Sequence, residues 1–190
     1  MQQYDAALKL LLRGAATVAV RELTGVAIAN WLDTELPKVQ NLRLDLLGET
    51  VDQVLIQIEL QSANDAAMPL RMAEYCLGIY RLRGRFPRQL CLYVGEAPLR
   101  MERELRGPAV WFGYELVDIR SLDGHRLLES PNFEDNVIAI LTRLRDQKDA
   151  VRSIVTRIAG LADADRQRAL GQLLILAGLR HLEEVVEQEV

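Results

Sequence analysis

Apolar residues alternate along residues 42–61, and this alternation constrains the fold more than any other feature of the chain. The apolar even-numbered positions are Leu42, Leu44, Leu46, Val54, Ile56, Ile58 and Leu60. Because successive side chains of a strand point to opposite faces, a period of two predicts strands with one buried face. Gly48-Glu49-Thr50 separates the two alternating runs, so we predict a hairpin with its turn at these residues.

The opposite face of this predicted hairpin is mostly polar. It carries Arg43, Asp45, Gln53, Gln57, Glu59 and Gln61, interrupted by Leu47, Val51 and Leu55. Alternation alone favours a solvated surface, since antiparallel sheets commonly expose one face. However, Asp is depleted in strands and Glu mildly so, which calls for another reason for an acid in each strand. Carboxylates held close together repel each other unless a cation or a proton lies between them, so Asp45 and Glu59 are candidate ligands of a divalent metal ion.

The order of these residues resembles a known active-site motif. Asp45, followed on a hydrophobic strand by Glu59-Leu60-Gln61, resembles the motif of the PD-(D/E)xK nuclease superfamily. Gln61, where most of the superfamily has Lys, is similar to the bacterial recombination-promoting nuclease and transposase-like branch.

Three further segments resemble that branch. Residues 4–9 are similar to its opening Asp-x-x-Phe-Lys motif, with Leu8 in the aromatic place, and residues 70–75 are similar to its Arg-x-x-x-Tyr helix through Arg71 and Tyr75. Residues 87–95 resemble its next core strand. The likeness covers about residues 4–120.

The resemblance implies a restriction-endonuclease-like α/β (α+β) fold, in which a mixed sheet of four or five strands is flanked by helices. It places a nuclease-like domain in residues 1–130 and leaves a helical C-terminal extension in residues 131–190. The activity that it implies is hydrolysis of DNA by a Mg2+- or Mn2+-dependent endonuclease, and the family name links that activity to recombination or transposition.

The resemblance also assigns roles to individual residues. Asp45, Glu59 and the main-chain carbonyl of Leu60 would bind Mg2+ or Mn2+, and Gln61 would orient the attacking water or a phosphate oxygen. Arg71 and Tyr75 would support the site or border its cleft. Gln57 lies on the same strand face as Glu59, where it either hydrogen-bonds to the site residues or is a solvated surface residue.

Charged residues elsewhere leave two interpretations open. Asp5 and Lys9 are spaced i, i+4 in a predicted helix, so they either form a surface ion pair or border the active cleft. Four arginines lie at and beyond the end of the helix predicted over residues 69–82: Arg81, Arg83, Arg85 and Arg88. Cations favour a helix C-terminus, but four exceed that need, and a patch that contacts DNA phosphates is the other interpretation.

Helical spacing predicts further helices over residues 4–12, 16–36, 133–144, 150–161 and 165–186, with Asp163 or Asp165 capping the last one. Strands are predicted over residues 89–95 and 111–119 and a turn over residues 121–125. The leucines of the last helix either complete the core or form a homodimer interface; they are Leu173, Leu174, Leu176, Leu179 and Leu182.

Composition narrows the class of protein. The net charge of −4 argues against binding nucleic acid by overall basicity. The sequence has neither a membrane-spanning apolar run nor the features of a signal peptide, so a cytoplasmic protein without membrane contact is expected. Cys76 and Cys91 are predicted to be buried, reduced thiols rather than a disulfide or a zinc site. Neither His125 nor His181 lies beside a nucleophile in the sequence.

Two other functions remain open at this stage. One is a non-catalytic module of the nuclease fold that binds DNA or a protein partner. The other is a metal-free phosphodiesterase or RNA-processing enzyme, for which the arginine patch is the only support.

Overall fold

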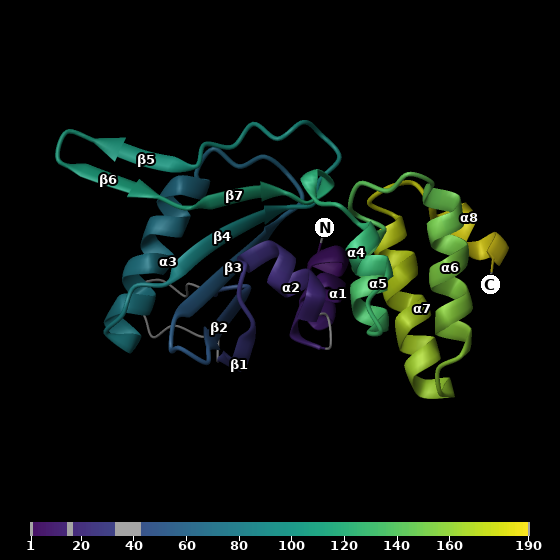
Figure 1. Ribbon diagram of the computed structural model, residues 1–190. Helices are drawn as coiled ribbons and strands as arrows, with labels where there is room; N and C mark the ends of the chain where they lie inside the picture. The colour runs from purple at the N-terminus through teal and green to yellow at the C-terminus, as the bar shows by residue number, and fades with distance from the viewer. Residues whose placement is uncertain (1, 15–16, 33–42, 190) are drawn as a thin grey trace. The chain divides into compact units, whose positions relative to one another are not determined.

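The computed structural model describes residues 2–14, 17–32 and 43–189 (Figure 1). Their contacts group the chain into two compact units, Val26–Asp118 and a second unit formed by Met1–Gly25 together with Ile119–Val190. The first unit contains all the strands that the structure describes, and the second is helical. The predicted mixed α/β fold with a helical C-terminal region is therefore confirmed.

A five-stranded mixed sheet forms the centre of the Val26–Asp118 unit, with its strands in the order β1-β2-β3-β4-β7. The strands are β1 (Ile28–Leu32), β2 (Leu46–Thr50), β3 (Leu55–Gln61), β4 (Arg88–Tyr93) and β7 (Glu115–Asp118). β2 runs antiparallel to both β1 and β3, whereas β3, β4 and β7 are parallel. A separate antiparallel hairpin consists of β5 (Glu104–Gly107) and β6 (Val110–Gly113).

Helix α3 (Met68–Arg83) connects the parallel strands β3 and β4, because parallel neighbours need a crossover segment. Pro69 lies in its first turn, and Gly84 ends it in the left-handed conformation with φ 69°. The buried side of α3 packs on one face of the sheet (Figure 1). This core includes Met68, Met72, Tyr75 and Ile79 from α3 and Leu47, Leu55, Cys91 and Tyr93 from the strands. The helix predicted over residues 69–82 is confirmed, and so are the two buried free thiols.

The predicted position of the hairpin turn is wrong. Gly48, Glu49 and Thr50 continue strand β2, and the turn lies at residues 51–54. Thr50 closes it, since its N–H donates to the carbonyl of Val54 at 2.9 Å and its Oγ1 accepts from the Val54 N–H at 3.0 Å. Gly48 is instead a packing position, because a Cβ there would lie 2.8 Å from Cγ2 of Ile28 on β1. Leu42 lies outside the described residues.

The face of β3 predicted to be solvated is buried. Gln57 is 0% exposed and Glu59 is 3% exposed, whereas Gln61 at the end of the strand is half-buried. The reason is that α3 packs on this face of the sheet. The leucines that interrupted the polar pattern, Leu47 and Leu55, belong to the core beneath that helix.

Two other predicted elements are divided in the structure. The helix predicted over residues 16–36 is only α2 (Thr17–Thr24), because Gly25 follows at φ 73° and strand β1 then pairs with β2. Residues 16 and 33–36 of that prediction lie outside the described residues. The strand predicted over residues 111–119 is split at Tyr114 into β6 and β7, which belong to different sheets.

The second unit contains α1 (Gln2–Arg13) and α2 from the N-terminal part of the chain and five helices that follow a short 3-10 helix at Ile119–Ser121. These five are α4 (His125–Leu128), α5 (Phe133–Ala139), α6 (Gln147–Ala159), α7 (Asp163–Ala177) and α8 (Glu183–Glu189). Asp135 of α5 connects the N-terminal helices of this unit to its C-terminal helices. Its carboxylate accepts hydrogen bonds from the backbone N–H groups of Val18 and Ala19. The helix predicted over residues 4–12 is confirmed as α1.

The helix predicted over residues 165–186 is broken in the structure. A segment in which His181 has φ 52° separates α7 from α8. The capping prediction is also wrong: the N-cap of α7 is Ala162, and Asp163 and Asp165 lie in its first turn, where they pair with Arg166 and Arg168. Four of the leucines predicted to pack are buried, namely Leu173, Leu176, Leu179 and Leu182. None of the described helices is both long enough and apolar enough to cross a bilayer.

Candidate active site

Two carboxylates meet where β2 begins and β3 ends. Leu46 pairs with Ile58 in the antiparallel register, which brings Asp45, just before β2, beside Glu59. The Oδ2 atom of Asp45 accepts a hydrogen bond of 2.9 Å from the backbone N–H of Leu60. The predicted convergence of the two acids is therefore present, although Asp45 precedes its strand instead of lying within it.

Arg71 holds the Glu59 carboxylate from the first turns of α3. Its Nη2 atom lies 2.7 Å from Oε1 of Glu59, and its Nη1 atom lies 2.8 Å from Oδ2 of Asp65. Asp65 lies in the loop after β3, and its Oδ1 also accepts from the Ala67 N–H at 2.8 Å, just before α3 begins. One guanidinium thus joins the end of β3, the following loop and the start of α3.

A chain of amides supports Glu59 from the other side. Gln89 donates through Nε2 to Oε1 of Gln57 at 2.9 Å and to the carbonyl of Met72 at 2.8 Å. Gln57 in turn donates through its Nε2 to Oε2 of Glu59 at 3.4 Å. The parallel register that pairs Gln57 with Gln89 creates this contact. Both carboxylate oxygens of Glu59 therefore have donors.

Burial changes the titration of this site. Removal from water and the neighbouring Asp45 charge raise the pKa of Glu59 from 4.5 to about 8, although the contact with Arg71 opposes the rise. Burial also raises the pKa of the Cys91 thiol to about 12, with a further contribution from Glu59. Burial and the charge of Glu59 likewise raise the pKa of Tyr75. The site thus disfavours additional negative charge and favours a proton or a cation near Asp45 and Glu59.

The donor chemistry fits a hard divalent cation. Among the residues that the structure describes, no group of three or more His, Cys, Asp or Glu side chains is arranged to hold a metal ion. Mg2+, however, is usually bound by one or two carboxylates, with water and substrate phosphate as its other ligands. Asp45 and Glu59 supply two carboxylates, and a main-chain carbonyl at Leu60 would be a third oxygen ligand. For Glu59 to bind a metal, one of its present hydrogen bonds has to yield.

The loops that follow β3 and β4 are joined at this edge of the sheet. The N–H of Val94 donates to the carbonyl of Gln61 at 2.8 Å, and Asn64 accepts from the Arg100 N–H at 2.7 Å through Oδ1. Gly95 permits this approach, because a Cβ there would lie 2.3 Å from the Ser62 carbonyl oxygen. The half-buried Gln61 side chain therefore lies beside two loops that hydrogen bonds hold together.

The structure brings together most of the predicted site residues but not all of them. Asp45, Glu59, Leu60 and Gln61 lie with the supporting residues Gln57, Arg71 and Tyr75 in one region of the Val26–Asp118 unit. Two members, Asp65 and Gln89, were not identified from the sequence. Asp65 falls in a predicted loop and Gln89 in a predicted strand, and only the fold places them beside Arg71 and Gln57.

The predicted DNA-binding arginines lie at the other end of α3 and β4. Arg71 and Arg83 are separated by twelve positions of α3, which is about 18 Å at 1.5 Å per residue. Arg85 contacts Glu49 and the carbonyl of Gln53, and Arg88 pairs with Glu115 at 2.7 Å. Arg81 and Arg83 are exposed. Asp5 and Lys9 lie on α1 in the helical unit, so their role at a cleft stays a prediction.

The described residues define a mixed α/β protein in which a buried Glu59, at the carboxyl end of a central strand, lies beside a partly buried Asp45. No family model matches the chain, and no curated protein or solved structure matches it.

Proposed function

We propose that this chain is a metal-dependent endonuclease that hydrolyses phosphodiester bonds of DNA. The observation that carries the proposal is the adjacency of Asp45 and Glu59, in which burial and mutual repulsion raise the pKa of Glu59 to about 8. A pair of this kind gains stability from a divalent cation that neutralises both carboxylates. The resemblance of Asp45 and Glu59-Leu60-Gln61 to the PD-(D/E)xK motif supports the same activity and its link with recombination or transposition.

The residues have separate tasks in this proposal. Asp45 and Glu59 would bind Mg2+ or Mn2+ together with the Leu60 carbonyl, and the bound cation would lower the pKa of an attacking water and polarise the phosphate. Gln61, at the end of β3, would orient the water or a phosphate oxygen by hydrogen bonding. Because an amide carries no charge, Gln61 cannot replace the positive charge of a lysine.

Arg71 is suited to a second task in the same reaction. It lies 2.7 Å from Glu59 and its side chain is 33% exposed, so its guanidinium is accessible to a substrate phosphate. The N–H groups of Arg71 that Glu59 and Asp65 do not use would contact the phosphate. The exposed Arg81 and Arg83 would contact phosphates of the same DNA farther along its backbone.

The proposal is tested by cleavage of supercoiled plasmid in Mg2+, in Mn2+ and in chelator. We expect metal-dependent nicking by the wild type and a loss of about 100-fold or more in Asp45→Ala and Glu59→Gln, since each removes a metal ligand. Glu59→Gln keeps an acceptor for Arg71, so it separates lost chemistry from lost folding. Asp165→Asn, which alters an exposed ion pair in the helical unit, is the matched control. The nuclease proposal fails if the purified wild type does not cleave or if nicking survives both substitutions.

One observation favours a second candidate, a non-catalytic module that binds DNA or a protein. The Glu59 carboxylate is 3% exposed and already has donors from Arg71 and Gln57, as in a structural ion pair. Such a module would keep its affinity for its partner in chelator and in the Glu59→Gln variant. Retention of duplex DNA binding without any cleavage would favour it over the nuclease.

A further inference from the structure

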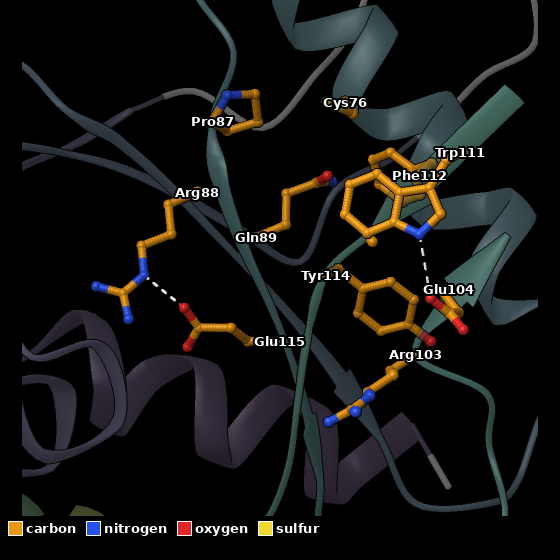
Figure 2. A pocket seen from close by; sticks show the side chains of 11 residues that line it. Cys76, Pro87, Arg88, Gln89, Arg103, Glu104, Trp111, Phe112, Tyr114 and Glu115 are labelled. Atoms are coloured by element: carbon orange, nitrogen blue, oxygen red, sulfur yellow. Dashed lines mark hydrogen bonds and ion pairs between the residues drawn. The ribbon is translucent and has the colours of Figure 1, made fainter.

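A groove of about 520 Å3 lies beside the β5–β6 hairpin, within the Val26–Asp118 unit. Its walls come from α3, β4, β6 and the start of β7 (Figure 2). Three neighbouring positions give it aromatic side chains: Trp111, Phe112 and Tyr114. A volume between about 300 and 1,000 Å3 is usual for sites that bind small organic groups.

Trp111 presents a fixed aromatic face to solvent. It is 68% exposed, so this large aromatic ring does not contribute the stability that burial would give. The indole lies over Gly113, because a Cβ at Gly113 would be 3.0 Å from Cζ2 and 3.2 Å from Cη2 of the ring. The indole N–H also donates to Oε2 of Glu104 at 3.1 Å (Figure 2). Trp111 is therefore held in place with an accessible face, as a stacking surface requires.

Arg103 supplies positive charge to the same groove. Arg88 is paired with Glu115, and Glu104 is paired with Arg106, so these charges are already compensated. Arg103 is exposed, and within the part of the chain that the structure describes its guanidinium makes no hydrogen bond or ion pair, although its charge helps to lower the pKa of Glu104. Figure 2 shows Arg103 beside the Tyr114 ring at the groove. The groove thus combines a stacking surface with a cation available to an anion.

We infer that this groove binds one unpaired nucleotide of single-stranded DNA, with its base stacked on Trp111 and its phosphate on Arg103. Aromatic platforms next to cationic side chains bind single strands in this way, because every base has a π-face and every nucleotide a phosphate. A duplex does not fit this requirement, since its bases are already stacked on one another.

Hydrogen bonds between buried amides connect the groove with Asp45 and Glu59. Gln89 lines the groove and donates to Gln57, which donates to Glu59. Gln57 and Glu59 are two positions apart on β3, or about 7 Å at the rise of a strand. The inference rests on the proposed nuclease function and specifies its substrate: DNA with unpaired nucleotides near the cleaved bond.

Binding is measured by fluorescence anisotropy of labelled dT12 in chelator, so that no cleavage is needed. We expect Trp111→Ala to weaken binding about tenfold, which is the effect of losing one base stack. Arg103→Ala should lower the slope of log Kd against log salt by about 0.7, which corresponds to one phosphate contact on a single strand. The neighbouring Val110→Ala, exposed on the same hairpin, and Arg145→Ala, exposed in the helical unit, are the matched controls and should match the wild type.

A 12-mer of abasic sites separates stacking from charge. It should bind about as weakly to the wild type as dT12 binds to Trp111→Ala, because it has the phosphates without the bases. Trp31→Phe leaves Trp111 as the remaining tryptophan, and dT12 should then quench its fluorescence. Equal affinity for dT12 and the abasic strand, or for wild type and Trp111→Ala, overturns the inference. If the wild type does not cleave plasmid but keeps Trp111-dependent binding of dT12, the nuclease is rejected and the groove is kept.

Discussion

The Nη2 atom of Arg71 lies 2.7 Å from Oε1 of Glu59, and this ion pair links helix α3 to the central strand β3. The two partners have different environments, since the side chain of Glu59 is 3% exposed and that of Arg71 is 33% exposed. A carboxylate so deeply buried depends on its donors, because an unpaired buried charge is costly. The pair therefore contributes to the fold and also controls the charge of the candidate metal site.

Removing the guanidinium should destabilise the protein. We expect Arg71→Met to lower the free energy of unfolding by about 1–3 kcal/mol at about pH 9, where Glu59 is ionised in the folded wild type and loses its charged donor. The double variant Arg71→Met/Glu59→Gln should recover part of this loss, since no buried charge then remains. Urea denaturation of the four proteins of this cycle measures the coupling. Arg88→Met is the control, since its pair with Glu115 is exposed on both sides and should contribute less than about 1 kcal/mol. A coupling near zero would contradict this account.

Stability should fall as the pH rises from about 5 to about 8. The pKa of Glu59 is raised from 4.5 to about 8 in the folded state, so the native protein binds this proton more tightly than the unfolded chain does. The resulting stabilisation is complete below about pH 4.5 and is lost as the pH passes about 8, with a slope of at most about 1.4 kcal/mol per pH unit.

The difference between wild type and Glu59→Gln isolates this effect, because groups distant from Glu59 titrate equally in both and the raised pKa values of Tyr75 and Cys91 lie above this pH range. Urea denaturation in chelator at several pH values should show the difference in stability changing across this range. A difference that does not vary with pH would mean that Glu59 stays ionised throughout. Addition of Mn2+ at pH 7 should release protons if the metal binds at this carboxylate, which calorimetry in buffers of different ionisation enthalpy detects.

The buried amide chain should be sensitive to loss of its first member. We expect Gln89→Leu to lower the free energy of unfolding by about 1–3 kcal/mol, because Oε1 of Gln57 and the Met72 carbonyl lose their donor. Thermal unfolding of the variant provides the measurement. Gln188→Leu, at an exposed position of α8, should change stability by less than about 0.5 kcal/mol. Equal losses of stability at Gln89 and Gln188 would contradict the hydrogen-bonded chain of amides.

Two glycines should respond in opposite directions to the same substitution. Gly95→Ala should destabilise by about 1–3 kcal/mol, because the new Cβ would lie 2.3 Å from the Ser62 carbonyl oxygen. Gly171→Ala, in helix α7 with no atom within 4 Å of the added Cβ, should stabilise by about 0.5–1 kcal/mol. Chemical denaturation of both variants beside the wild type tests the pair. A stabilised Gly95→Ala would contradict the close approach of the two loops.

Local patterns in the sequence identified most of the elements and the acids of the candidate site. The period-two run predicted β2 and β3, and helical spacing predicted α1, α3, α5 and α6, because these patterns depend on neighbours along the chain. The closeness of Asp45, just before β2, to Glu59 on β3 followed from the same run. Gly48 is the exception: glycine is common in turns, but Gly48 lies within β2 and packs against Ile28.

The sequence by itself determined a mixed α/β protein with two acids at adjoining strands. The tertiary structure decided that α3 covers the polar face of β3, which turned Gln57 and Glu59 from expected surface residues into buried ones. It also brought Gln89 to Gln57 and Asp65 to Arg71, and it placed Arg81 and Arg83 about 15–18 Å along α3 from Arg71. The physical reason is that alternation records which residues share a face of a strand, whereas burial and the identity of a polar partner depend on segments distant in sequence.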